Sequence, residues 1–218
     1  MCKGSDKMHK RLITFGCSYT YGHGLADCHV PRNNAGPHPS KFAWPQLLAD
    51  RLNLECVNLG KPGGSNKLMW WRTVNFEFEP TDVVIYYATF PDRDMIINND
   101  DNETWQMGPW SGLGKRANAF HRYLVQSNST KTWEYQSYVH IDHAYHHVLR
   151  QGVKNVFHFK RKNKDFEHEL PSWATFKFHP VCVEDMVTIK DVALDGSHPG
   201  PKSHEQIAKR MSELLPKF

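Results

Sequence analysis

The 218-residue chain contains no long hydrophobic run, no paired cysteine motif and no strong excess of either charge. No stretch approaches the roughly 18 consecutive apolar residues of a membrane-spanning helix, and the initial stretch MCKGSDKMHKR lacks the apolar core of a secretory signal. Five cysteines, at positions 2, 17, 28, 56 and 182, are odd in number and form no C-x-x-C pair, which favours reduced thiols over a disulfide framework. These absences predict a soluble, cytoplasmic protein with no membrane partner.

The formal net charge of +4 is spread thinly, and KRKNK at 160–164 is the only basic run. Such a run is more typical of a solvated loop than of a nucleic-acid site, so no nucleic-acid partner is expected. Hydrophobic residues make up 39% and aromatic residues 12%, which is enough for a substantial core. Because no repeat, low-complexity tract or linker divides the sequence, we expect a single domain over residues 1–218.

Strand and helix signals alternate along the chain, as they do in α/β proteins with a mostly parallel sheet. DVVIYYA at 82–88 is a near-continuous apolar run, typical of a strand buried on both faces. Either Ser65 or Asn66 can cap the helix that follows them, and Gly152 is expected to close a later one. The pattern predicts a three-layer α/β/α sandwich, flavodoxin-like in its general arrangement. Other strands are predicted at 11–15, 55–59 and 155–160, and helices at 44–53, 67–78, 132–151 and 201–215.

Residues 96–130 interrupt this alternation. The stretch NNDDNETWQMGPWSGLG is polar, carries scattered tryptophans and is too long for an ordinary connection, so we predict a lid-like insertion here. Trp105, Trp110 and Trp133 can stack on a sugar ring near a site, although packing explains any one of them more simply. Residues 161–190 show no clear pattern.

The stretch LITFGCSYTYGHG at 12–24 indicates a short strand that stops at a glycine and delivers Ser18 into a glycine-bordered turn. A serine hydroxyl is a poor nucleophile near neutral pH unless an imidazole accepts its proton, and that imidazole usually needs a carboxylate to orient it. Whether Ser18 is a nucleophile or part of an ordinary connection therefore depends on partners elsewhere in the chain.

A carboxylate and an imidazole lie three residues apart in LDGSHPGPKSH at 194–204. Pro199 pushes His198 toward an extended conformation, and Gly196 permits a tight turn. Such a turn can hold the Asp195 carboxylate against one nitrogen of His198 and leave the other nitrogen facing outward. The alternative is a helix-entry loop in which Asp195 bonds to its own backbone, and this segment alone favours neither interpretation.

Backbone donors for a negatively charged oxygen are available in NLGKPGGSN at 58–66, where glycines let N–H groups approach a bound atom closely. Taken alone this is a weak signal, because glycine-rich turns are common after strands. All three segments, however, lie just after a predicted strand or just before a predicted helix. Ligands of open α/β sheets bind at that carboxyl edge.

The three segments together resemble the blocks of the SGNH (GDSL-like) hydrolases, in the order that the family has. ITFGCSYTYG is similar to the first block, which implies that Ser18 is the nucleophile. NLGKPGGSN is similar to the second, which implies that Gly63 and the Ser18 N–H group bind the oxyanion. DGSHPG followed by H-x-x-I-A is similar to the last, which implies that Asp195 and His198 are the acid and base. The resemblance implies no metal and no organic cofactor.

Two positions depart from the family pattern. Cys17 stands where the first block usually has aspartate; it is an alternative nucleophile, although a small buried thiol is the more ordinary role. The third block normally carries Gly-x-Asn-Asp, and its asparagine is an oxyanion donor, but here the strand continues into ATFPDRD at 88–94. This stretch resembles a T-x-P-x-R variant of phage-type relatives. Thr89 or Arg93 is then the candidate for the missing donor.

The resemblance implies hydrolysis of a carboxylic ester, such as an O-acetyl group on a carbohydrate, through an acyl-enzyme; the partner is then a small-molecule or carbohydrate ester. Two alternatives stay open. One is a non-catalytic binding or structural protein, of viral type, that keeps the fold without the oxyanion asparagine. The other is a lipase or thioesterase, which needs a long apolar groove for its acyl chain.

The stretch HIDHAYHH at 140–147 is the remaining candidate for a site. On a helix His143 and His147 share one face and His140 lies near His143, a spacing that can bind a transition metal. There is no H-E-x-x-H pattern and no evident third ligand, so a polar helix face is the favoured interpretation.

Overall fold

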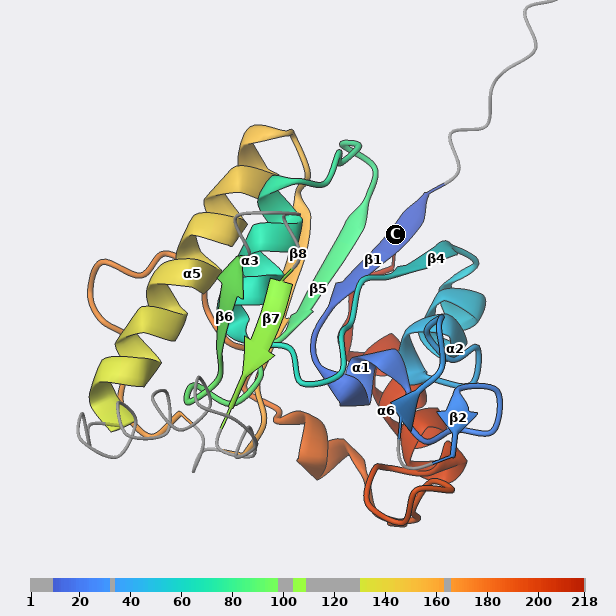
Figure 1. Cartoon of the computed structure of the whole chain (residues 1–218). Coiled ribbons are helices and arrows are strands. Elements are labelled where there is room, and N and C mark those ends of the chain that lie inside the picture. Colours follow the sequence, from blue (N-terminus) through green and yellow to red (C-terminus); the bar gives the residue numbers. More distant parts are fainter. Residues whose placement is uncertain (1–9, 32–33, 98–103, 109–129, 163–165, 218) are drawn as a thin grey trace, which may run out of the picture.

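A four-stranded parallel sheet forms the centre of the molecule, in the order β4–β1–β5–β8 (Figure 1). The computed structural model describes residues 10–31, 34–97, 104–108, 130–162 and 166–217. Neighbouring strands pair in parallel, with Ile13 opposite Val57 on one side and Val84 on the other. Strand β4, which is the second of these strands along the chain, lies at the edge of the sheet next to β1, as in flavodoxin-like folds. The strands are β1 (Arg11–Phe15), β4 (Glu55–Asn58), β5 (Val83–Tyr87) and β8 (Asn155–Phe159).

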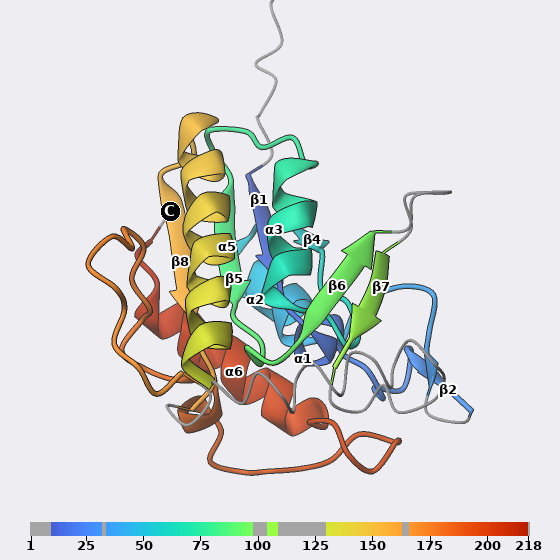
Figure 2. The ribbon, with the colours of Figure 1, turned by 60° about the vertical axis from the view of Figure 1, so that its left-hand side comes forward.

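Two pairs of helices cover the two faces of this sheet (Figures 1 and 2). Helices α2 (Trp44–Leu52) and α6 (Pro201–Leu214) contact each other on one face, and α3 (Asn66–Val74) and α5 (Thr130–Arg150) on the other. Successive strand side chains point to opposite faces, so Leu12 packs with Leu48 and Ile207 while Ile13 packs with Met69 and Val148. The structure therefore confirms the predicted three-layer α/β/α sandwich.

Strand β5 shows why a continuous apolar run predicts a central parallel strand. All five of its residues are buried. Val83, Ile85 and Tyr87 belong to the core beneath α2 and α6, and Val84 and Tyr86 belong to the core beneath α3 and α5. A strand with helices on both faces needs apolar side chains at every position.

One helix boundary was predicted wrongly. Helix α3 ends at Val74, whereas the sequence predicted a helix to residue 78. Beyond the helix, Phe76 and Phe78 pack against each other, with ring centroids 4.9 Å apart, and Phe78 lies 6.3 Å from Phe15. Both rings pack into the core although the backbone that carries them is not helical. Because these positions are apolar, the hydrophobic pattern of the sequence continues past the residue at which the helix ends. At its start, Ser65 rather than Asn66 is the cap, and its hydroxyl accepts the Leu68 N–H at 3.1 Å.

The predicted insertion begins with an antiparallel hairpin of β6 (Asp94–Ile97) and β7 (Thr104–Met107), separate from the main sheet. Strand β6 contacts α3. Residues 98–103 and 109–129, including Trp110, lie outside the described residues. The segment 161–190 contains a short 3-10 helix, η2 (Val183–Met186). Within the described ranges no helix is long and apolar enough to span a bilayer, and the described cysteines form no disulfide.

Candidate active site

Ser18 opens a four-residue helix, α1 (Ser18–Tyr21), that follows β1 at the carboxyl edge of the sheet (Figure 1). Cys17 is the residue before the helix, and its side chain is buried. Gly16 must lack a side chain because a Cβ there would collide with the hydroxyl of Thr20. Ser18 itself is only 6% exposed. The strand-to-turn interpretation of the sequence is therefore correct, with one helical turn in place of a loop.

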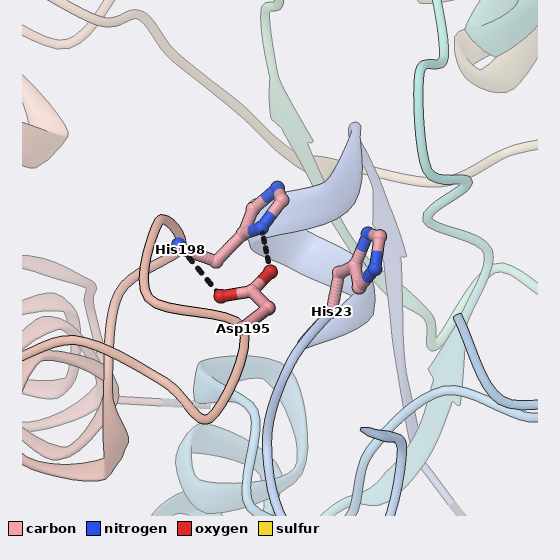
Figure 3. A group of neighbouring side chains, drawn as sticks. All are labelled: His23, Asp195 and His198. Atoms are coloured by element: carbon pink, nitrogen blue, oxygen red, sulfur yellow. Dashed lines mark hydrogen bonds and ion pairs between the residues drawn. The ribbon is translucent and has the colours of Figure 1, made fainter. Parts of the chain in front are cut away.

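The carboxylate of Asp195 and the imidazole of His198 are in direct contact, and Figure 3 shows the pair. Asp195 Oδ2 and His198 Nδ1 are 2.5 Å apart, and Oδ1 accepts the N–H groups of Ser197 and His198 at 3.0 and 3.1 Å. Burial alone raises the pKa of the Asp195 carboxyl, but these backbone and imidazole hydrogen bonds outweigh it and lower that pKa well below its ordinary value. An ionised, almost fully buried carboxylate thus holds one nitrogen of a half-buried imidazole.

The turn that carries this pair is fixed to the start of α6. The Asp191 carboxylate accepts the N–H groups of Lys202 and Ser203 at 2.9 and 2.8 Å and the Ser203 hydroxyl at 2.6 Å. The Ala193 N–H group bonds across the turn to the carbonyl of His198 at 2.8 Å. Because Asp191 satisfies donors that a helix end leaves open, the turn and α6 form one unit.

Gly24 brings the turn into contact with the segment that follows α1. Its φ is +84°, and a Cβ at this position would lie 2.7 Å from Asp195 Cγ and 2.9 Å from the Ala193 side chain. The Leu194 N–H group donates to the Gly24 carbonyl at 2.9 Å. Only glycine combines this backbone conformation with so close an approach.

The imidazole of His198 lies against α1 and the residue just after it. Its ring contacts Tyr19 edge-on, with centroids 5.7 Å apart, and stacks on His23 at 4.5 Å. Tyr19 is the neighbour of Ser18, so the pair and the serine share one edge of the sheet. Among the hydrogen bonds of the described residues, none joins the Ser18 hydroxyl to His198; such bonds are often loose without substrate.

The glycine-rich loop after β4 runs beside α1. The side chain of Asn58 donates to the Thr20 carbonyl at 2.7 Å and accepts the Gly60 N–H at 2.9 Å. The Lys61 N–H group donates to the Gly16 carbonyl at 3.0 Å. Gly63 has a φ of +71°, a conformation that glycine adopts without strain. Segments from two neighbouring strands thus meet around Ser18.

The variant stretch after β5 meets the same loop. Asn66 binds the buried Thr89 backbone at both ends, accepting its N–H at 2.9 Å and donating to its carbonyl at 3.0 Å. Arg93 donates through Nη1 to the Thr89 hydroxyl at 2.9 Å and to the Gly64 carbonyl at 3.4 Å. Thr89 is completely buried, whereas Arg93 is half-buried. Of the two candidate donors, only Arg93 therefore exposes part of its side chain, and the Thr89 hydroxyl accepts a hydrogen bond from it.

A pocket of about 270 Å³ opens beside His198, between α1, η2 and the start of α6. The guanidinium of Arg161 lies 4.9 Å from the centre of the Tyr19 ring and 4.1 Å from that of Phe90, and its Nε is 2.9 Å from Glu184. The pocket can accept a small and largely apolar group. Its remaining walls come mostly from apolar side chains: Tyr87, Val183, Val187, Val192, Pro199 and Ile207.

His23 is the member of this region that the sequence analysis missed. Nothing in GHG at 22–24 distinguishes it among 14 histidines. With Asp195 and His198 it forms a group whose ligand atoms all lie within 4.8 Å of one another, the only group of that kind in the described part of the chain.

The histidine-rich helix forms no such group within the described residues. His143 accepts the indole N–H of Trp70 at 2.9 Å, and His147 lies 2.7 Å from the side chain of Gln151. Both histidines thus have polar partners on neighbouring side chains. Of the three tryptophans, Trp133 is half-buried on α5, and the side chains of the other two lie outside the described residues.

No family model matches this sequence, and no curated protein does. Among solved structures, an acetyl xylan esterase from the rumen bacterium Butyrivibrio proteoclasticus aligns with a TM-score of 0.52 at 16% identity. That alignment covers 94% of this chain and 62% of the esterase, so this chain spans under two thirds of its length. An aryl esterase of M. smegmatis aligns with a TM-score of 0.50 at 13% identity, over 94% of this chain and 97% of the other. At these identities the likeness shows the fold alone: the parallel sheet between helical layers is shared with two proteins named as esterases.

Proposed function

We propose that the protein is a serine esterase in which Ser18 is the nucleophile, His198 the general base and Asp195 the orienting acid. The observation that carries the proposal is the Asp195–His198 contact of 2.5 Å, held by a buried carboxylate next to the helix that Ser18 opens. A buried ionised carboxylate on Nδ1 fixes the tautomer in which Nε2 can accept a proton.

In the first half of the reaction, the Ser18 oxygen attacks the ester carbonyl carbon while its proton passes to His198 Nε2. The carbonyl π electrons move to oxygen and give a tetrahedral oxyanion. As the oxyanion collapses, the bond to the alcohol breaks and His198 returns the proton to the leaving oxygen. The acyl group stays on Ser18, and a water then repeats the sequence to release the acid and restore the serine.

The oxyanion is bound by the N–H groups of Ser18 and Gly63 together with the Arg93 guanidinium. Two observations support Arg93 in place of the missing asparagine: Arg93 bonds to Gly64 in the glycine loop, and Thr89 fixes its Nη1 at 2.9 Å. One oxyanion donor contributes about 3–4 kcal/mol to the stability of the transition state, or 10²–10³ in rate. A charged donor can make up for the loss of a neutral one.

The substrate that suits this site is a small ester, such as an O-acetyl group on a carbohydrate. A pocket of about 270 Å³ lies next to His198, and its size suits a short acyl or small alcohol group. The two structural neighbours are named for acetyl xylan and aryl esters. The size of this pocket supports a small ester as substrate.

Hydrolysis of p-nitrophenyl acetate by the purified protein tests this proposal. Ser18→Ala should reduce the rate to the uncatalysed background, a loss of about 10⁴-fold or more. Ser212→Ala, which removes an exposed hydroxyl from α6, should leave the rate unchanged. Activity should also persist in EDTA. Equal inertness of the wild type and Ser18→Ala towards acetyl esters would contradict the proposal in favour of a non-catalytic binding protein.

A further inference from the structure

We infer that His23, Asp195 and His198 together form a binding site for a divalent transition-metal ion, represented here by Zn²⁺, whose occupancy blocks the imidazole of His198. The metal site goes beyond the proposed esterase function, and its existence does not depend on that function. The three side chains are drawn in Figure 3, where the turn at 195–198 faces the end of α1.

The ligand types match the chemistry of zinc. Two imidazoles and one carboxylate bind Zn²⁺ at about 2.0–2.2 Å, and three protein ligands leave one position for water. The ligand atoms of the three residues already lie within 4.8 Å of one another. His23 supplies the third ligand. Without it, Asp195 and His198 supply only two ligands, as any Asp–His pair does.

Two of the ligands are held in place by the surrounding backbone. Asp195 Oδ1 accepts the N–H groups of Ser197 and His198, which leaves Oδ2 directed at the imidazole. Partners of this kind orient a ligand before the ion arrives. Oδ2 and Nδ1 are 2.5 Å apart now and must separate by about 0.8 Å to bind one ion tetrahedrally at the distances that zinc prefers.

His23 is the ligand that has to move. Its ring stacks on that of His198 with an interplanar angle of 22°, so the in-plane lone pairs run side by side rather than toward one point. A rotation of the half-buried His23 side chain brings its nitrogen to the ion. The metal-bound state thus differs from the present one in the orientation of the His23 ring and in the separation of Asp195 Oδ2 from His198 Nδ1.

The ion binds His198 Nδ1 in place of the proton that Nδ1 shares with Asp195 Oδ2. That proton leaves Nδ1 for solvent, and Nε2 takes up one proton from solvent, so the imidazole stays neutral with its single proton on Nε2. Nε2 then has no lone pair with which to accept the proton of Ser18. Zn²⁺ is therefore a reversible inhibitor in an esterase that needs no metal.

Competition with a fluorescent zinc chelator tests the site directly on protein dialysed free of metal. The variant His23→Phe keeps a ring to stack on His198 and removes the ligand nitrogen. His38→Phe, at an exposed histidine elsewhere, is the matched control. We expect the wild type and His38→Phe to bind one Zn²⁺ per chain, and His23→Phe to bind at least tenfold more weakly. His23→Gln serves as a second variant if circular dichroism shows that His23→Phe does not fold.

Equal Zn²⁺ affinity in His23→Phe and wild type, or no binding by the wild type, would overturn the inference. The Ser18→Ala variant separates this outcome from a failure of the proposed function, because it should bind Zn²⁺ as the wild type does while hydrolysing nothing. In the active wild type, Zn²⁺ should inhibit p-nitrophenyl acetate hydrolysis over the same concentration range in which it binds, and EDTA should restore the rate.

Discussion

Replacement of Gly24 by alanine should separate the Asp195–His198 pair from α1 without touching either residue. The new Cβ would lie 2.7 Å from Asp195 Cγ and 2.8 Å from Oδ1. Carbon atoms in contact prefer about 3.5–4.0 Å, so the carboxylate or the backbone beneath Gly24 must move by about 1 Å. A displacement of that size at a reacting centre can cost about 10² in rate.

The expected loss in kcat/KM for Gly24→Ala is therefore at least about 100-fold, which corresponds to about 2.7 kcal/mol of transition-state stabilisation. The left-handed backbone at Gly24 adds a separate cost in stability of about 1–2 kcal/mol for any residue with a Cβ. Kinetics with p-nitrophenyl acetate and urea denaturation measure the two effects independently.

Gly196→Ala is the matched control for this variant. Gly196 also has a left-handed backbone, with φ of +72°, but a Cβ there would meet nothing within 4 Å. It should show a similar loss of stability and a kcat/KM within a few-fold of the wild type. If Gly24→Ala keeps its kcat/KM, or if Gly196→Ala loses as much, then steric access to Asp195 is not what Gly24 provides.

Two further predictions concern a charge and a buried histidine. If the guanidinium acts on the oxyanion, Arg93→Gln should lower kcat by about 10²–10³ with little change in KM. The same substitution at the exposed Arg51 is the control and should alter neither constant. Steady-state kinetics on an acetyl ester measure both variants. Burial lowers the pKa of His158 to about 3, below its unfolded value of about 6.5. Between these two pH values only the unfolded chain binds this proton. The free energy of unfolding therefore falls as the pH drops through this range. His158→Phe, which keeps the stack on Tyr86, should remove about 2 kcal/mol of the loss between about pH 7.5 and about pH 5, as measured by urea denaturation; an unchanged pH dependence would contradict the assignment.

The sequence predicted the main elements well where burial on both faces leaves a continuous signal. β5 is an example, because a strand between two helical layers has to be apolar throughout. For the turn at 195–198 the sequence left two interpretations open, and the structure contains elements of both: Asp195 contacts the His198 imidazole and also accepts the backbone N–H groups of Ser197 and His198.

Contacts between distant segments could not be predicted in the same way. Nothing near Gly24 indicates that a carboxylate about 170 positions later will pack against its Cα. The role of Asn66 was likewise hidden: as a polar residue at a helix start it resembled a cap, yet its amide binds the Thr89 backbone. Helix α3 was extended too far because Phe76 and Phe78 keep an apolar pattern after the hydrogen bonds of the helix have ended.

The serine and its proposed partners come from opposite ends of the described chain, with Ser18 on the segment after the first strand and His198 just before the last helix. Bringing them together closes a loop of 180 residues, from 198 − 18, and this loop contains the rest of the sheet. The proposed catalysis therefore requires that the whole domain has assembled. Recovery of activity during refolding should follow global folding rather than early local structure, which makes ester hydrolysis a sensitive reporter of the fully folded population.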